Sequence, residues 1–212
     1  MADETRSERR ALRVSALILA AGASRRMDGR DKLLEDVGGR PILRAVAQEA
    51  LASAVCEVLI VLPPQNRDRL AAVAGLDVRV VEAVGCEAGM GASLAAGITA
   101  LPGETDAVLI MLADMPDVSA GDMGRIIAAY DPRQGREICR AVTRSGEIGH
   151  PVLFGRRFFA DLAALKSEEG GRTIVRHHFD AVVDVVTTGR SAVTDLDTQR
   201  DWIAWRSARE PS

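Results

Sequence analysis

The stretch ALILAAGASRRMDGRDKLL, residues 16–34, carries most of the information about the fold. It opens with an apolar run that ends at once in alanine and glycine, and a loop follows with three arginines, two aspartates and a lysine. A short run that is apolar at every position is typical of a strand buried on both faces of a parallel sheet. Small residues directly after it allow a ligand to approach the backbone closely. We therefore predict a buried strand at 14–20 whose exit faces a ligand.

The same run admits a second interpretation as a signal peptide. Arg9 and Arg10 precede it, residues 14–21 would be a short apolar core, and small residues follow. The immediate Gly22 and the charged loop favour the strand. We expect residues 1–13, which are polar and charged, to form a flexible leader, and residues 14–212 to form a single domain.

Short apolar runs alternate with amphipathic stretches along the remaining chain, which predicts an α/β fold with a mostly parallel sheet covered by helices on both faces. In such a sheet, ligands bind at the carboxyl ends of the strands, near the point where the strand order switches. The residues that directly follow each strand are therefore candidates for a site. We expect strands at 14–20, 55–62, 78–81, 107–112, 137–143, 151–154 and 182–186. We expect helices at 41–52, 65–74, 91–101, 119–130, 156–165, 172–179 and 198–206.

Composition narrows the classes of partner. The 212 residues carry a net charge of −3, so no broad basic field attracts nucleic acid or an anionic membrane. Cys56, Cys86 and Cys139 are scattered without metal-binding or disulfide spacing, which favours a reducing cytoplasm. No apolar run approaches the roughly 20 residues of a membrane-spanning helix. We expect neither nucleic acid nor a membrane as a partner.

The loop after the first strand combines small residues with positive charge. Successive backbone N–H groups in a tight turn bind anions, and arginine and lysine add charge-assisted hydrogen bonds to phosphate oxygens. The alternative is a solvated basic turn, because Asp28 and Asp31 offset part of the charge. The residues that would bind phosphate are Ala20, Ala21, Gly22, Ser24, Arg25, Arg26 and Lys32. We expect the Lys32 side chain to face solvent when no ligand is bound.

Acidic residues occupy two later positions of interest. Asp114 directly follows the strand at 107–112, where a carboxylate suits Mg²⁺, an ion that prefers hard oxygen ligands and phosphates. A cap of the next helix is the alternative role for Asp114. Asp195 and Asp197 alternate around Leu196, so both carboxylates can lie on one side of the chain. A helix cap explains Asp197 equally well.

Two glycine-bearing segments carry weaker signals. Residues 85–93, GCEAGMGAS, open a helix, where backbone N–H groups can face an anion. Neither GxGxxG after the first strand nor GxxxxGK[ST] anywhere is present, which argues against a hydride-transfer enzyme and a P-loop NTPase. The segment Gly149-His150-Pro151 precedes a strand, and from the residues alone it is a turn with an ordinary histidine.

The motifs LAAGASRRMDGRDKLL, GGRPIL, GMGASLAAGI, LADMP, GHPVLF and DLDT occur in this order between residues 15 and 202. Together they resemble the MobA-like nucleotidyltransferases, and among these most of all the molybdenum cofactor cytidylyltransferases. The resemblance implies a three-layer Rossmann-like fold of the nucleotide-diphospho-sugar transferase type, with a mostly parallel mixed sheet. It implies Mg²⁺ as cofactor, CTP and a phosphorylated pterin as substrates, and a molybdoenzyme as client. Ala21 stands where the guanylyl-transferring relatives usually carry glycine, which favours CTP over GTP.

The resemblance also implies roles for individual residues. Arg26, Lys32 and Asp114 would be catalytic, and Asp114 and Asp197 would hold the metal ion. His150 and Arg172 would bind the acceptor. The nucleotide would be bound by Leu19, Ala20, Ala21, Gly22, Ser24, Arg25, Arg26, Lys32, Gly89, Met90, Ser93 and Asp114.

Three departures from the family pattern concern the edges of this site. Asp28 replaces a glycine, residues 167–172 read SEEGGR where the family has roughly GDxGAR, and Gln199 replaces a proline. Two alternatives therefore stay open. One is cytidylyl transfer to a sugar or polyol phosphate, and the other is a non-catalytic carrier of the molybdenum cofactor.

Overall fold

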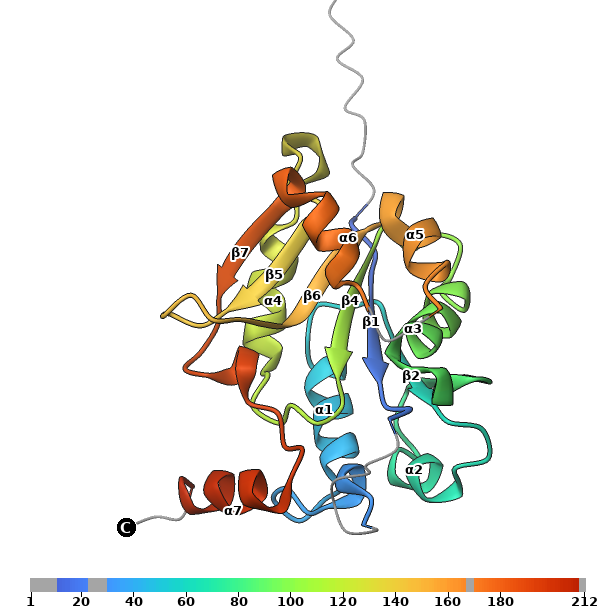
Figure 1. Ribbon diagram of the computed structural model, residues 1–212, viewed down its shortest axis with the longest axis vertical. Helices are drawn as coiled ribbons and strands as arrows, with labels where there is room; N and C mark the ends of the chain where they lie inside the picture. The colour runs from blue at the N-terminus through green and yellow to red at the C-terminus, as the bar shows by residue number, and fades with distance from the viewer. Residues whose placement is uncertain (1–10, 23–29, 167–169, 210–212) are drawn as a thin grey trace, which may run out of the picture.

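Within residues 11–22, 30–166 and 170–209, which the computed structural model describes, seven strands form one mixed sheet in the order β3-β2-β1-β4-β6-β5-β7 (Figure 1). Strand β6 runs antiparallel to both of its neighbours, β4 and β5, and the remaining neighbours pair in parallel. The expectation of a mostly parallel mixed sheet is confirmed. The strands are β1 (Val14–Leu19), β2 (Glu57–Leu62), β3 (Arg79–Glu82), β4 (Ala107–Leu112), β5 (Ile138–Val142), β6 (Ile148–Gly155) and β7 (Val182–Val186).

Helices cover both faces of this sheet and complete three layers (Figure 1). Helices α1 and α4 pack with the even-numbered residues of β1, such as Ile18, in one apolar cluster. Helices α3, α5 and α6 pack with Leu17 in a second cluster on the opposite face. The helices are α1 (Ile42–Leu51), α2 (Arg67–Ala72), α3 (Met90–Thr99), α4 (Ala120–Ala129), α5 (Phe159–Ala163), α6 (Arg172–His177) and α7 (Gln199–Ser207). Short 3-10 helices are η1 (Lys32–Leu34), η2 (Cys86–Ala88), η3 (Pro132–Gln134), η4 (Arg156–Phe158), η5 (Phe179–Ala181) and η6 (Ser191–Val193).

Strand β1 lies in the middle of the sheet between β2 and β4. Its side chains are buried on both faces, as its predominantly apolar sequence predicts, and its one polar residue, Ser15, is buried as well. The chain continues from β1 to β2 and β3 on one side and later returns to β4 on the other side. The strand order therefore switches between β1 and β4, which is where an open α/β sheet binds its ligands.

The structure differs from the sequence expectations at two elements. Strand β6 begins at Ile148, so Gly149 and His150 belong to a strand and not to a turn before it. An added Cβ at Gly149 would lie 1.7 Å from the carbonyl oxygen of Ala192, so only glycine allows this close approach to η6. The helix expected at 156–165 divides into η4 and the shorter α5.

The chain before β1 is already attached to the sheet at Arg13. Its backbone N–H donates to the Asp106 carboxylate, and its carbonyl oxygen accepts from the Asp106 N–H at 2.8 Å. Residues 1–10 of the expected leader lie outside the described residues. No helix that the structure describes is long and apolar enough to cross a membrane.

Candidate active site

The carboxyl ends of β1 and β4 lie side by side. Leu19 pairs with Leu112, and the N–H of Ala113 donates to the carbonyl oxygen of Leu19 at 3.2 Å. The loop after β1 and Asp114 therefore start from the same point of the sheet edge. Ala20 and Ala21 are buried, and Leu19 is partly buried.

Gly22 is exposed at the end of this described stretch. An added Cβ there would meet no atom within 4 Å, so packing within the described chain does not require glycine at this position. Among the described residues, no atom fills the space beside Gly22.

Lys32 lies between two carboxylates that come from distant parts of the chain. Its Nζ is 2.5 Å from Oδ2 of Asp114 and 2.5 Å from Oδ1 of Asp197. The three side chains keep only 13%, 16% and 24% of their surface exposed, respectively. The expectation that Lys32 faces solvent is therefore wrong, because the sheet brings two carboxylates within reach of its ammonium group. Burial by itself would lower the pKa of Lys32, but the two carboxylates outweigh it and the pKa is raised.

A backbone hydrogen bond places Asp197 beside Asp114. The N–H of Leu196 donates to the carbonyl oxygen of Asp114 at 3.0 Å. Thr198, not Asp197, caps α7, because its hydroxyl accepts from the N–H of Asp201. The pKa of Asp195 is raised, first by its partial burial and then by the nearby negative charges of Asp114 and Asp197. The capping alternative for Asp197 is therefore wrong.

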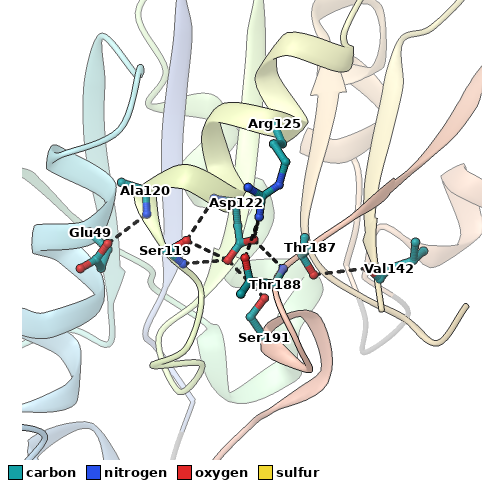
Figure 2. Close-up of polar contacts among 9 residues, drawn as sticks. All are labelled: Glu49, Ser119, Ala120, Asp122, Arg125, Val142, Thr187, Thr188 and Ser191. Carbon is teal, nitrogen blue, oxygen red and sulfur yellow. Dashed lines mark hydrogen bonds and ion pairs between the residues drawn. The ribbon is translucent and has the colours of Figure 1, made fainter. Parts of the chain in front are cut away.

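Asp122 connects the start of α4 with the segment that contains Thr188 and Ser191 (Figure 2). Its fully buried carboxylate accepts from the backbone N–H and hydroxyl of Ser119 at the start of α4, which follows Asp114. It also accepts from the N–H of Thr188 at 2.8 Å, the hydroxyl of Ser191 at 3.2 Å, and Arg125. Burial would raise the pKa of Asp122, but these hydrogen bonds outweigh it and the pKa is lowered. The chain from Thr188 leads through η6 to Asp197, so one carboxylate anchors both sides of the Lys32 site.

Asp114 does not cap the following helix, because Ser119 caps α4 in a capping box with Asp122. The second carboxylate oxygen of Asp114, Oδ1, is buried without a hydrogen-bond partner among the described residues. No group of three or more histidine, cysteine, aspartate or glutamate side chains in the described ranges is arranged to hold a metal ion. The site thus offers an unsatisfied hard oxygen but an incomplete set of protein ligands.

His150 and Arg172 lie within electrostatic range of this site. Burial, and next the positive charge of Arg172, lower the pKa of His150 to about 4, and Asp114 acts in the opposite direction. His150 comes from the first part of β6, and Arg172 is the first residue of α6. The structure therefore places His150 within electrostatic range of both Arg172 and Asp114, with the imidazole neutral at pH 7.

The second glycine segment leads into α3. Gly89 has φ +129°, which favours glycine, and directly precedes the helix. Met90 is exposed, and Ser93 is buried within α3, which agrees with the helix expected at 91–101. Within the described part of the chain, no hydrogen bond or ion pair joins this segment to Lys32.

Some expected site residues lie outside the part of the chain that the structure describes, namely Ser24, Arg25, Arg26, Asp28 and residues 167–169. Their expected roles remain predictions.

Sequence reasoning missed Arg69. Its guanidinium, only 3% exposed, contacts Asp31 and the carbonyl oxygen of Ala20. Arginine on a short polar helix normally points to solvent, so local sequence carries no signal for this burial.

Comparison with known proteins places the chain in a family. Residues 16–182 match the MobA-like NTP transferase domain family. Nicotine blue oxidoreductase of Paenarthrobacter nicotinovorans is 27% identical over 190 residues, which cover 87% of this chain and 92% of that protein. A probable molybdenum cofactor guanylyltransferase of Haloferax mediterranei is 39% identical over 108 residues, which cover 50% of each chain.

The solved structures agree with this assignment. Rv0371c of Mycobacterium tuberculosis has a TM-score of 0.80 at 27% identity, covering 93% of this chain and 100% of that chain. A complex of Rv0371c with manganese has a TM-score of 0.72 at 24% identity, covering 91% and 97% of the two chains. The family match spans most of the sequence, so the resemblance is confirmed. The chain belongs to the MobA-like NTP transferase domain family, a family of nucleotidyltransferase enzymes.

Proposed function

We propose that this enzyme transfers CMP from CTP to the terminal phosphate of molybdopterin or molybdenum cofactor and releases pyrophosphate, with Mg²⁺ as its metal ion. We also propose that residues 14–212 act as one nucleotidyltransferase domain in the cytoplasm. The observation that carries this proposal is the Lys32 ammonium between Asp114 and Asp197, at the carboxyl ends of β1 and β4. Phosphoryl-group transfer depends mainly on positioning the reactants and on neutralising phosphate charge. An ammonium group supplies positive charge directly, and a pair of carboxylates supplies it by binding a metal ion.

The two carboxylates fit a divalent cation. Asp114 has a buried oxygen without a partner among the described residues, and Asp197 is held beside it. Mg²⁺ is commonly bound by one or two carboxylates together with substrate phosphates, which suits a site with few protein ligands. Asp114 and Asp197 would hold the ion, which when bound supplies neutralisation of charge on the phosphate oxygens. The manganese complex of Rv0371c agrees with the choice of a divalent ion.

The residues of this chain would divide the remaining work. Lys32 donates hydrogen bonds to the triphosphate, and the open space beside Gly22 admits it close to the backbone. The acceptor phosphate is already ionised at pH 7, so no general base is required. Its oxygen bonds to the α-phosphorus of CTP as the bond to pyrophosphate breaks in line. Catalysis is then mostly orientation and electrostatic stabilisation.

His150 and Arg172 would bind the acceptor phosphate. Because its pKa is about 4, His150 is neutral at pH 7 and contributes a hydrogen bond without charge. Arg172 contributes the positive charge. A molybdoenzyme that receives the finished cofactor is the proposed client.

The choice of CTP over GTP depends on Ala21. This residue is 7% exposed and packs mainly into the cluster around Leu17, so only a small part of it is accessible to a base. The Haloferax relative named as a guanylyltransferase makes GTP the natural competitor to test.

The test is to measure pyrophosphate release from CTP, GTP and ATP with Mg²⁺, each with molybdopterin and with sugar or polyol phosphates, and to identify products by mass spectrometry. Release that requires CTP and molybdopterin supports the proposal. Equal release with GTP overturns the choice of base, and release only with a sugar or polyol phosphate overturns the choice of acceptor. Pterin binding without release identifies a carrier. Oxidation or reduction of nicotine blue instead would indicate the activity for which the Paenarthrobacter relative is named.

A further inference from the structure

Arg69 joins the two ends of the segment that links β1 to Lys32. Its Nε lies 2.6 Å from Oδ2 of Asp31, and its Nη2 lies 2.9 Å from Oδ1 of the same carboxylate. Its Nη1 donates to the carbonyl oxygen of Ala20 at 2.5 Å. One guanidinium therefore contacts the residue directly after β1 and the residue directly before Lys32.

Asp31 transmits this placement to Lys32. It is the N-cap of η1, and its Oδ1 accepts from the N–H of Leu33 at 3.0 Å. Lys32 is the first residue of η1, so the start of this short helix is set by the carboxylate that Arg69 holds. Leu33 is buried in the core, which anchors the backbone of η1 that carries Lys32.

Arg69 is itself held in a fixed position. It lies on α2, where its backbone N–H donates to the side chain of Asn66, the N-cap of that helix, at 2.9 Å. Its side chain is almost completely buried. A guanidinium can bind a carboxylate with two parallel hydrogen bonds and still donate a third in the same plane, whereas a lysine ammonium lacks this fork.

We propose that Arg69 is a positioning residue for nucleotidyl transfer, setting the place of Lys32 relative to the exit of β1. The inference rests on the proposed function of the Lys32 site. A buried ion pair adds little net stability compared with apolar residues of the same size, so its value here is the geometry that it imposes. Misplacement of a group by about 1 Å can lower an enzymatic rate roughly 100-fold.

The test compares Arg69→Lys and Arg69→Ala with Arg44→Met. Arg44 is the matched control because it donates to the carbonyl oxygens of Ala72 and Ala74 at the other end of α2, at 3.0 Å each. We expect Arg69→Lys to lower kcat about 10- to 100-fold with little change in the KM for nucleotide. Methylguanidinium added to Arg69→Ala should restore part of kcat. Arg44→Met should keep kcat and KM. Wild-type kcat in Arg69→Lys would overturn the proposal.

Amide hydrogen exchange at Leu33 and Leu34 gives a readout that does not depend on activity. Exchange there should be faster in Arg69→Lys than in the wild type and unchanged in Arg44→Met. Unchanged exchange in both Arg69 variants would overturn the proposal even if they are inactive. If exchange is faster in Arg69→Lys but the wild type releases no pyrophosphate from any nucleotide, the link from Arg69 to η1 holds and the proposed function has failed.

Discussion

The ammonium nitrogen of Lys32 lies 2.5 Å from Oδ2 of Asp114, a residue 82 positions further along the chain. The same nitrogen lies 2.5 Å from Asp197. A protein side chain therefore occupies the place between two carboxylates where a divalent ion would be coordinated. In the proposed function, Lys32 and the metal ion would compete for these two carboxylates, and a triphosphate that attracts the lysine would make them available.

Replacing Lys32 with methionine should increase the response of the folded protein to divalent ions. Without the ammonium, Asp114 and Asp197 repel each other, so the free energy of unfolding in EDTA should fall by about 2 kcal/mol, less than for a fully buried pair. Mg²⁺ or Mn²⁺ should then raise the unfolding midpoint more in Lys32→Met than in the wild type. Pyrophosphate release should fall about 100-fold or more, because a charge at the transferring group is lost. Lys166→Met, at an exposed lysine, is the control for both measurements. An equal metal response in wild type and Lys32→Met would contradict the competition.

Asp114→Asn should separate catalysis from nucleotide binding. Asparagine keeps the shape but loses the charge, so turnover should fall about 100-fold and the Mg²⁺-dependent gain in CTP affinity should disappear. CTP affinity in EDTA should change little. Isothermal titration with and without Mg²⁺ measures both, and Asp106→Asn, at the opposite end of β4, is the matched control. A normal Mg²⁺ response in Asp114→Asn would remove Asp114 from the site.

Ala21→Gly should weaken discrimination between bases. If the methyl group limits the room for a purine, its removal should raise kcat/KM for GTP relative to CTP about tenfold. Ala20→Gly makes the same truncation at the neighbouring buried residue and controls for added backbone freedom. A ratio that is unchanged in Ala21→Gly, or equally changed in both variants, would show that another group selects the base.

Stability should depend on pH through His150. Its pKa is about 4 in the folded protein against an ordinary value of 6.5, because burial and next Arg172 disfavour the charged form. Between pH 6.5 and 4, the imidazole is therefore protonated in the unfolded chain but not in the folded protein. The contribution of His150 to the free energy of unfolding is fully present above pH 6.5 and decreases as the pH falls toward 4. In denaturant titrations across this range, His150→Asn should lose less stability than the wild type. His177→Asn, at an exposed histidine on α6, should follow the wild-type slope.

Gly97→Ala should destabilise the contact of α3 with the sheet. An added Cβ would lie 2.5 Å from Cδ1 of Leu17 and 2.9 Å from Cγ2 of Val61, so overpacking should cost about 1–3 kcal/mol. Gly124→Ala in α4 is the matched substitution, because a Cβ there would meet nothing within 4 Å. It should instead stabilise the protein by about 0.5–1 kcal/mol through helix propensity. Denaturant midpoints of both variants decide whether α3 packs this closely.

Local sequence predicts most elements because their causes are local. The apolar run of β1, the Ser119 cap of α4 and the proximity of Asp114 to the end of β4 all follow from a few adjacent residues. The expectations failed where distant segments decide the outcome. Strand β6 extends back to Ile148 because Val142 pairs with it and because Gly149 fits against η6.

By itself, the sequence determined the alternation of strands and helices and the polar residues that follow each strand. Hydrophobic periodicity and backbone preference act over a few residues, so they can be recognised without knowledge of the tertiary structure. Only the tertiary structure decided that Lys32 meets Asp114 and Asp197, the latter 165 positions away, and that Arg69 meets Asp31. The contact of Lys32 with Asp114 exists because parallel pairing brings the carboxyl ends of β1 and β4 to one edge of the sheet. Asp197 and Arg69 join it because the segment before α7 and helix α2 pack against the same edge.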